Sequence, residues 1–307
     1  MSKPSKVDYA FSPSILDAFQ RMLDTKVEDY FYQDETGAWH QNWNETEETL
    51  HYSEEEVDAL LKQEFLDKVN KVPTPPSEAA SKGTAFNEIV DCLVLRKKAV
   101  NPNVVIKTVR SGDDLSQTRE ETGLSEDGRI TFDKVGKTFI YAGLDGFEFF
   151  FDKEFCLGAA EYFRNSICQY YTKSLLETQK GIVELHGYID YLRQNIVFDC
   201  KTTRRYTFGD FQKKWQRYTY PFALIESGMM NEVSSFEFTV YVLSGGTSRT
   251  PLITGKQYKE IYTYDHEQAR QMLTQQCERL AEFLEDNRDK IVNEKIFGYG
   301  ISDNRQD

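Results

Sequence analysis

Residues 181–203, GIVELHGYIDYLRQNIVFDCKTT, constrain the fold of this chain more than any other stretch. They predict two β-strands, at about Ile182–Leu192 and Asn195–Lys201, because both runs are rich in β-branched, aromatic and apolar residues. The polar residues 193–195 between them make a turn of hairpin length. The run Ile196–Phe198 is typical of a core strand, so the charged residues that follow it are expected at the rim of a sheet.

Three charged side chains lie near the ends of the two predicted strands. Asp190 lies near the end of the first strand, and Asp199 and Lys201 lie at the end of the second. Residues two apart on a strand share a face, so Asp199 and Lys201 point the same way, and the hairpin can bring Asp190 beside them. Two carboxylates and an ammonium can hold a divalent cation and position a water for attack on a phosphodiester. The alternative is an exposed hairpin with solvated charges, which the adjoining apolar run disfavours.

Gly187-Tyr-Ile-Asp190 and, after the turn, Val197-Phe-Asp-Cys-Lys-Thr-Thr203 resemble the active-site hairpin of the PD-(D/E)XK nucleases. The resemblance is to their RecB-like and phage recombination-exonuclease branch. The pattern there is G-x-x-D, a short turn, hydrophobic residues and D-x-K-T-[TS]. It implies an α/β, restriction-endonuclease-like fold, with a mixed central sheet flanked by helices and a metal site at the rim of the sheet.

The same resemblance implies metal-dependent hydrolysis of DNA. Asp190, Asp199 and the backbone carbonyl of Cys200 would bind one or two Mg²⁺ or Mn²⁺ ions. Lys201 would orient and help to deprotonate the attacking water, or stabilise the charge that develops on the phosphorus centre.

A helix is predicted from Lys82 to about Leu95, and its start resembles the G-T-x-x-[HE] helix of the family, which supplies a metal ligand or a catalytic polar group. Asn87 stands where the family has His or Glu, which is a departure from the pattern. Glu88 would substitute after a small rotation, and Asp91 lies one turn further along. An ordinary amphipathic helix is the alternative, with its apolar residues in the core.

Gln216-Arg-Tyr-Thr-Tyr220 resembles the Q-x-x-x-Y motif of the family, on a helix predicted at Phe208–Glu226 with a kink or break at Pro221. Residues four apart share a helical face. By resemblance, Gln216 would hold the catalytic lysine or the substrate, and Tyr220 would contact nucleic acid. The residues expected to bind nucleic acid beside it are Thr202, Arg204 and Arg205.

The chain is expected to comprise an N-terminal helical region (1–76) that packs on a nuclease core (77–300). The first eleven residues are predicted to be frayed, and helices are predicted near Ser12–Leu23 and Ser53–Val69. A β-rich insertion is expected at about 101–150, with strands near 103–110, 129–132, 137–141 and 147–151. A strong amphipathic helix at 265–287 closes the core, and the tail 301–307 is expected to be disordered.

The charge of the chain weighs against a protein that binds DNA over its whole surface. Lys and Arg number 37 against 50 Asp and Glu, which gives a net charge of −13. Basic residues nevertheless follow the predicted site, at 201–205 and 213–217, so a locally basic groove is compatible with this charge. The five cysteines are scattered without a C-x-x-C pair, which argues against a disulfide framework, a zinc site or an iron–sulfur cluster.

These observations predict a cytoplasmic, metal-dependent DNA exonuclease of phage or prophage recombination or repair, without a membrane segment. A single-strand-annealing or recombination protein is a candidate partner, and an oligomer is left open. Exonuclease versus endonuclease action, polarity and strand preference are also open. One alternative is a catalytically inactive nuclease-fold protein that binds DNA or a recombination partner, which Asn87 and the acidic charge favour. Another is an unrelated binding module in which the hairpin is coincidental.

Overall fold

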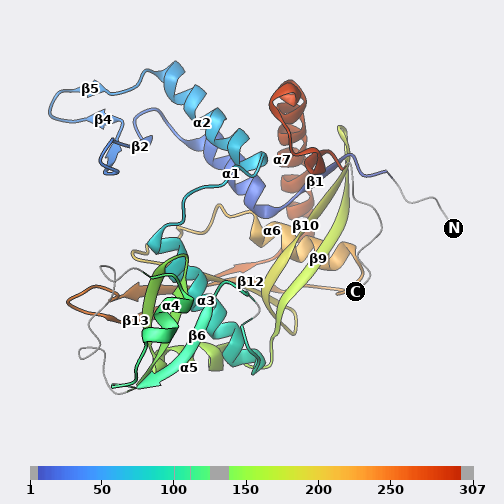
Figure 1. Cartoon of the computed structure of the whole chain (residues 1–307). Helices are drawn as coiled ribbons and strands as arrows, with labels where there is room; N and C mark the ends of the chain where they lie inside the picture. The colour runs from blue at the N-terminus through green and yellow to red at the C-terminus, as the bar shows by residue number, and fades with distance from the viewer. Residues whose placement is uncertain (1–5, 100, 111, 125–137, 299–307) are drawn as a thin grey trace.

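The computed structural model describes residues 6–99, 101–110, 112–124 and 138–298. In this part of the chain, nine strands form one mixed sheet with helices packed against it, so the predicted α/β fold with a mixed central sheet is confirmed (Figure 1). The strands of this sheet are β1 (Tyr9–Phe11), β6 (Val105–Arg110), β7 (Thr138–Leu144), β8 (Phe147–Asp152), β9 (Ile167–Thr178), β10 (Gly181–Arg193), β11 (Ile196–Thr203), β12 (Ser235–Ser244) and β13 (Leu252–Thr263).

The helices of the described residues are α1 (Pro13–Asp24), α2 (Glu54–Val69), α3 (Glu78–Leu95), α4 (Ser116–Glu121), α5 (Lys153–Tyr162), α6 (Gln216–Glu226) and α7 (His266–Asp286). Two short ribbons between α1 and α2 pair β2 (Phe31–Gln33) with β3 (Trp39–Gln41) and β4 (Trp43–Asn44) with β5 (Thr49–Leu50). Two 3₁₀ turns, η3 (Arg288–Lys290) and η4 (Glu294–Phe297), follow α7. None of these helices is long and apolar enough to span a bilayer.

The order of the sheet is β1-β10-β11-β12-β13-β8-β7-β6, with β9 on the free edge of β10. The predicted hairpin is present, because β10 and β11 are antiparallel and joined by a two-residue turn at Gln194 and Asn195. β11 then runs parallel to β12. Strands β1 and β11 lie on the same edge of β10, one at its start and one at its end.

Helices cover both faces of the sheet around β11, because this strand carries apolar residues on both of its faces. Phe198 and Cys200 pack with α3 and α5. Val197 packs on the opposite face, against α6 and β12. A third cluster joins α1, α2 and α7 to the first half of β10. The second half of the hairpin is therefore enclosed between α3 and α6.

Side-chain caps set the starts of several helices, whereas Ser12 precedes α1 without a side-chain cap hydrogen bond. Ser53 and Glu56 form a capping box at α2, and Asp265 accepts a hydrogen bond from the Gln268 amide at α7. Helix α3 begins earlier than predicted, at Glu78, because Ser77 caps it.

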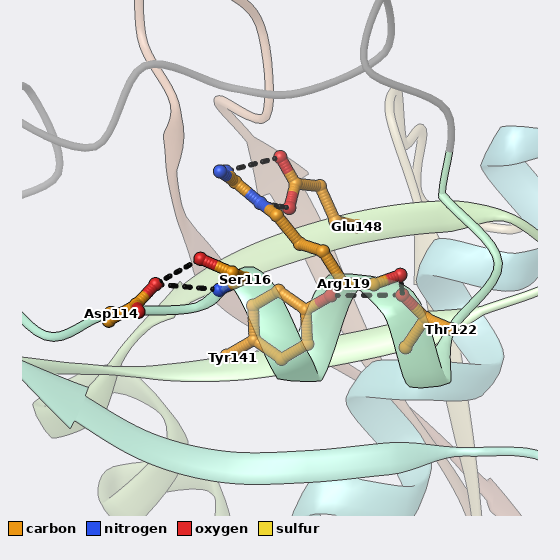
Figure 2. Close-up of polar contacts among 6 residues, drawn as sticks. All are labelled: Asp114, Ser116, Arg119, Thr122, Tyr141 and Glu148. Atoms are coloured by element: carbon orange, nitrogen blue, oxygen red, sulfur yellow. Dashed lines mark hydrogen bonds and ion pairs between the residues drawn. The ribbon is translucent and has the colours of Figure 1, made fainter.

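The β-rich segment at 101–150 continues the central sheet, since β8 runs parallel to β13. An ion pair ties α4 to β8 (Figure 2): Nε and Nη2 of Arg119 donate to the two carboxylate oxygens of buried Glu148, at 2.9 and 3.0 Å. In the same view, the Thr122 hydroxyl donates to the Arg119 carbonyl and lies 3.4 Å from the Tyr141 hydroxyl. The strand predicted at 129–132 lies outside the described residues, as does the tail 301–307.

Two predictions of local structure are wrong. Residues 9–11 are not frayed: Tyr9–Phe11 pairs with Val183–Leu185, and both aromatic rings are buried. The helix predicted from Phe208 begins only at Gln216. A turn takes its place at 207–210, where Gly209 has φ +96° and the Asp210 side chain accepts a hydrogen bond from the Thr207 amide. The helix continues through Pro221 without ending there.

Candidate active site where two strands diverge

Strands β10 and β11 pair over only three residues each, Tyr191–Arg193 with Ile196–Phe198. Beyond this point β10 continues against β9, and β11 continues against β12. The next residue of each strand is an aspartate, so Asp190 and Asp199 stand on the two sides of the divergence. Oδ2 of Asp190 accepts a hydrogen bond from the Cys200 amide at 2.8 Å, so this side chain bridges the two strands.

The pairing of β9 with β10 is interrupted at Asp190. The register contains Ile189 with Tyr170 and Tyr191 with Cys168, but not the intervening pair of Asp190 with Gln169. Gln169 has φ +50°, a conformation uncommon for residues other than glycine. Ile189 packs with α6 whereas Tyr191 packs with α3, although residues two apart in a regular strand share a face. This irregularity turns the Asp190 carboxylate towards β11.

Asp91 on α3 stabilises the interruption. Its Oδ1 accepts a hydrogen bond from the Tyr191 hydroxyl, and its Oδ2 accepts one from Nε2 of Gln169 at 3.0 Å. Burial raises the pKa of Asp91 to about 6, against the lowering effect of these two hydrogen bonds. Asp91 thus holds both strands beside Asp190, and both of its oxygens are engaged there.

Asp199 and Lys201 share the face of β11 that is turned to α6, as the strand period predicted. Oδ2 of Asp199 lies 2.5 Å from Nζ of Lys201, and the Asp199 residue is only 3% exposed. Nζ of Lys201 also lies over the ring of Phe238, 5.9 Å from its centroid. The lysine is therefore directed along the sheet face rather than into bulk water.

Burial and mutual repulsion disfavour the ionised carboxylates. Burial raises the pKa of Asp190, and the nearby charge of Asp199 raises it further, while Lys201 and the Cys200 amide oppose the shift. Burial also raises the pKa of Asp199 against the pull of Lys201. For Lys201 burial disfavours the charged form, but the Asp199 carboxylate outweighs it, so the pKa is raised. Two carboxylates that repel each other in a buried site are the arrangement that a bound cation would relieve.

The residues at the divergence fit an oxygen-ligated divalent cation. The amide of Cys200 points to Asp190, and in an extended strand the carbonyl of a residue lies on the same side as its amide, so this carbonyl faces the divergence too. Apart from its ion pair with Lys201, Oδ2 of Asp199 has no hydrogen-bond partner among the described residues. Two carboxylates and one carbonyl suit Mg²⁺, which keeps several of its waters when proteins bind it. The described residues contain no group of three or more His, Cys, Asp or Glu able to hold a metal.

The candidate ligands on α3 lie on the other face of β11. Oδ1 of Asn87 accepts a hydrogen bond from the Cys200 thiol at 3.3 Å, so this amide contacts the middle residue of the motif through its side chain. Glu88 accepts a hydrogen bond from the Asn101 amide at 3.1 Å, which directs one of its carboxylate oxygens towards the loop after α3.

Glycines allow the flanking elements to approach the site closely. A Cβ on Gly83 of α3 would collide with Oγ1 of Thr202, so Thr202 faces α3 and not the Lys201 side of the strand. A Cβ on Gly187 would lie 2.8 Å from Cε1 of Tyr220 and 3.4 Å from Cδ of Pro13. The glycines of the G-T and G-x-x-D motifs are thus required by the packing of α3, α6 and α1 on the hairpin.

The other predicted site residues lie on α6 and at the end of β11. Tyr220 is buried, and the charges of Asp199 and Asp190, together with burial, raise the pKa of its hydroxyl. Oε1 of Gln216, one turn earlier, is buried without a hydrogen-bond partner among the described residues, so it accepts no hydrogen bond from Lys201. Arg204 and Arg205 are exposed where β11 ends.

Sequence reasoning missed Asp17, on the first turns of α1. Its Oδ1 accepts a hydrogen bond from the Trp215 amide at 2.8 Å, and its Oδ2 lies 3.5 Å from Nζ of Lys214. Its charge also acts on Asp199 and Lys201. Asp17 lies next to the buried Leu16, on a helix whose predicted role is packing. Nothing local in the sequence links it to lysines that come almost 200 residues later.

A cavity of about 610 Å³ lies elsewhere, between β6 and the loop before α4, where Lys107, Asp113 and Asp114 line it. β6 is the outermost strand on the opposite edge of the sheet from β10 and β11. This cavity therefore does not belong to the candidate site.

Comparison with known proteins gives little to add. No protein-family model matches the chain, and no curated protein matches it. Among solved structures, one described as "Crystal structure of SSO0001" is similar over 38% of this chain and 50% of that chain, at 15% identity and a TM-score of 0.25. The match thus spans half the length of that protein.

Gly187→Ala should destabilise the protein by about 1–3 kcal/mol, because the added methyl group overlaps the buried ring of Tyr220. Urea unfolding monitored by fluorescence measures this change. Gly158→Ala is the matched control: Gly158 lies within α5 with nothing within 4 Å of its added Cβ, so alanine should stabilise the helix by about 0.5–1 kcal/mol. Equal effects of the two substitutions would contradict this packing.

Asp190→Asn should stabilise the metal-free protein increasingly as the pH rises from 4 to 8. The folded protein binds the Asp190 proton more tightly than the unfolded chain, so ionisation removes stability as the pH passes through the raised pKa. Thermal unfolding in EDTA at each pH measures the difference, which should reach at least about 1 kcal/mol at pH 8. Exposed Asp58→Asn should show no such trend. A loss of stability in Asp190→Asn at pH 8 would contradict the buried, repelled carboxylate.

Proposed function

We propose that this protein is a metal-dependent nuclease that hydrolyses phosphodiester bonds of DNA. The observation that supports it most is the convergence of Asp190, Asp199 and Lys201 where β10 and β11 diverge, with the Cys200 carbonyl turned to the same gap. The motif order from the sequence agrees with this placement.

Each residue has a role that follows from its surroundings. Asp190, Asp199 and the Cys200 carbonyl would hold one or two Mg²⁺ or Mn²⁺ ions. The bound ion supplies Lewis-acid polarisation of the scissile phosphate and activates water near neutral pH. The ion pair with Asp199 keeps Lys201 protonated, which suits an ammonium that orients the attacking water and stabilises charge on the phosphoryl oxygens.

Two exposed arginines beside the site can attract the DNA backbone. Residues 203–214 carry Arg204, Arg205, Lys213 and Lys214, and Asp24 and Asp17 of α1 form ion pairs with the two lysines. The exposed Arg204 and Arg205 therefore supply the positive charge that α1 does not offset. Positive charge next to the site favours binding of DNA phosphates there. Exonucleolytic action, a cytoplasmic role in phage or prophage recombination or repair, and a recombination protein as partner follow from the resemblance of the motifs.

A second candidate is a nuclease-fold protein that binds DNA without cleaving it. Asn87 favours it, since an amide bonded to the Cys200 thiol replaces the His or Glu of the motif. The two carboxylates at the divergence would then have no third acidic partner from α3.

Digestion of end-labelled linear DNA and of covalently closed circular DNA, with Mg²⁺ or Mn²⁺, separates these candidates. We expect the wild type to degrade the linear DNA, and Lys201→Ala to lose about 100-fold or more of the rate because the phosphoryl charge loses its ammonium. Lys173→Ala, at an exposed lysine of β9 that is also paired with a glutamate, should keep the wild-type rate.

The products decide the remaining alternatives. Cutting of the circle would make the protein an endonuclease, and the label position on linear fragments gives the polarity. No cleavage by the wild type with either ion would contradict the nuclease and favour the DNA-binding candidate.

A further inference from the structure

Phe208 is one of the most exposed apolar residues of the described chain, at 77%. It lies in the loop 204–215 that joins β11 to α6. The aromatic neighbours of Phe208 are not exposed in this way: Tyr206 lies against Tyr258 with centroids 5.1 Å apart, and Phe211 lies against Phe238 at 5.5 Å. The loop therefore packs its other aromatic rings on the sheet and directs this one outward.

The backbone on either side of Phe208 is fixed by hydrogen bonds. The Thr207 amide donates to Oδ2 of Asp210 at 2.7 Å, and the Gly209 amide donates to Oε1 of Glu260 at 2.9 Å. Glu260 is completely buried, and its other oxygen accepts a hydrogen bond from the Tyr262 hydroxyl. Because the backbone that carries the ring is tethered, binding of a ligand to the ring orders little additional backbone.

The loop adjoins the candidate site at both ends. It starts three residues after Lys201 and ends at Trp215, whose amide donates to Asp17. Lys214 at its end lies 3.5 Å from the second oxygen of Asp17, and the charge of Asp17 acts on Lys201. The exposed guanidinium groups of Arg204 and Arg205 flank its start. An aromatic face beside positive charges is the combination with which proteins bind single-stranded nucleic acid.

We propose that Phe208 is a nucleobase-binding site, on whose ring an unpaired base at a DNA end stacks while the flanking phosphates contact the basic loop. The proposal rests on the proposed function and deepens it by assigning the loop to a single-stranded segment next to the cleavage site. Stacking is tolerant of base identity because each base has a π-face, so the site would grip the strand without selecting sequence.

The test is binding of a fluorescein-labelled DNA duplex with a single-stranded tail, measured by anisotropy in EDTA and repeated in a Lys201→Ala background. Phe208→Ala should weaken binding of the tailed DNA by about tenfold, the scale of one lost aromatic stack. Phe208→Trp should retain affinity within about twofold. A blunt duplex without unpaired bases should be bound equally by the wild type and Phe208→Ala.

Two controls separate stacking from charge and from a general surface effect. The dependence of log Kd on log salt should be unchanged in Phe208→Ala, whereas Arg204→Gln should reduce its slope by about one phosphate contact. Phe31→Ala, at another exposed phenylalanine on the β2 ribbon, should leave Kd unchanged. Unchanged affinity in Phe208→Ala, an equal loss on the blunt duplex, or failure of tryptophan to restore binding would each overturn the nucleobase site.

The outcome is distinguishable from that of the nuclease proposal. If the wild type cleaves DNA and Phe208→Ala binds the tailed DNA normally, the nucleobase site is contradicted and the nuclease proposal stands. Tailed-DNA binding that depends on Phe208 without any wild-type cleavage leaves the site on a DNA-binding protein. No binding of tailed DNA by the wild type overturns the nucleobase site.

Discussion

The hydrogen bond from the Cys200 amide to the Asp190 carboxylate links β10 and β11 at the point where the two strands separate. The candidate site depends on this bond. Antiparallel strands that remained paired would direct these backbone groups to each other. Because the strands part after three pairs, the amide of Cys200 is satisfied by a carboxylate and its carbonyl is left facing the gap. The interruption of the β9–β10 pairing at Asp190 turns the Asp190 carboxylate towards β11. Asp91 stabilises this interruption through its hydrogen bonds with Tyr191 and Gln169.

The site is assembled at a cost to stability that the surrounding packing offsets. The two buried carboxylates are unfavourable without a cation, because burial raises the pKa of both and the charge of Asp199 raises that of Asp190 further. Groups with such shifted pKa values cluster at functional sites. The buried Tyr220, which packs closely on Gly187, lies beside the charges of Asp190 and Asp199 and limits the water around them. A low local dielectric strengthens the interaction of Lys201 with Asp199, and would likewise strengthen the interaction of both aspartates with a metal.

The hairpin and the shared face of Asp199 and Lys201 could be predicted, because strand propensity, a short polar turn and a period of two are local signals. The direction of the Asp190 side chain could not be predicted, because it depends on an interruption of the β9–β10 pairing and on the positive φ (+50°) of Gln169. Asp17 and β1 were missed for a similar reason, as their partners lie far along the chain. The extra length predicted for α6 is absent because the segment 207–210 makes a turn, whose Gly209 amide donates to a glutamate on β13 that lies some 50 residues along the chain.

The most direct measurement is a crystal structure of the protein grown with Mn²⁺, with anomalous difference density calculated at the manganese edge. The arrangement of donors predicts a peak within about 2.3 Å of carboxylate oxygens of Asp190 and Asp199 and of the Cys200 carbonyl. The ion pair between Asp199 and Lys201 should lengthen as the metal takes up the carboxylate. A saturating Mn²⁺ concentration that leaves no peak between these residues would contradict a metal site at the strand divergence.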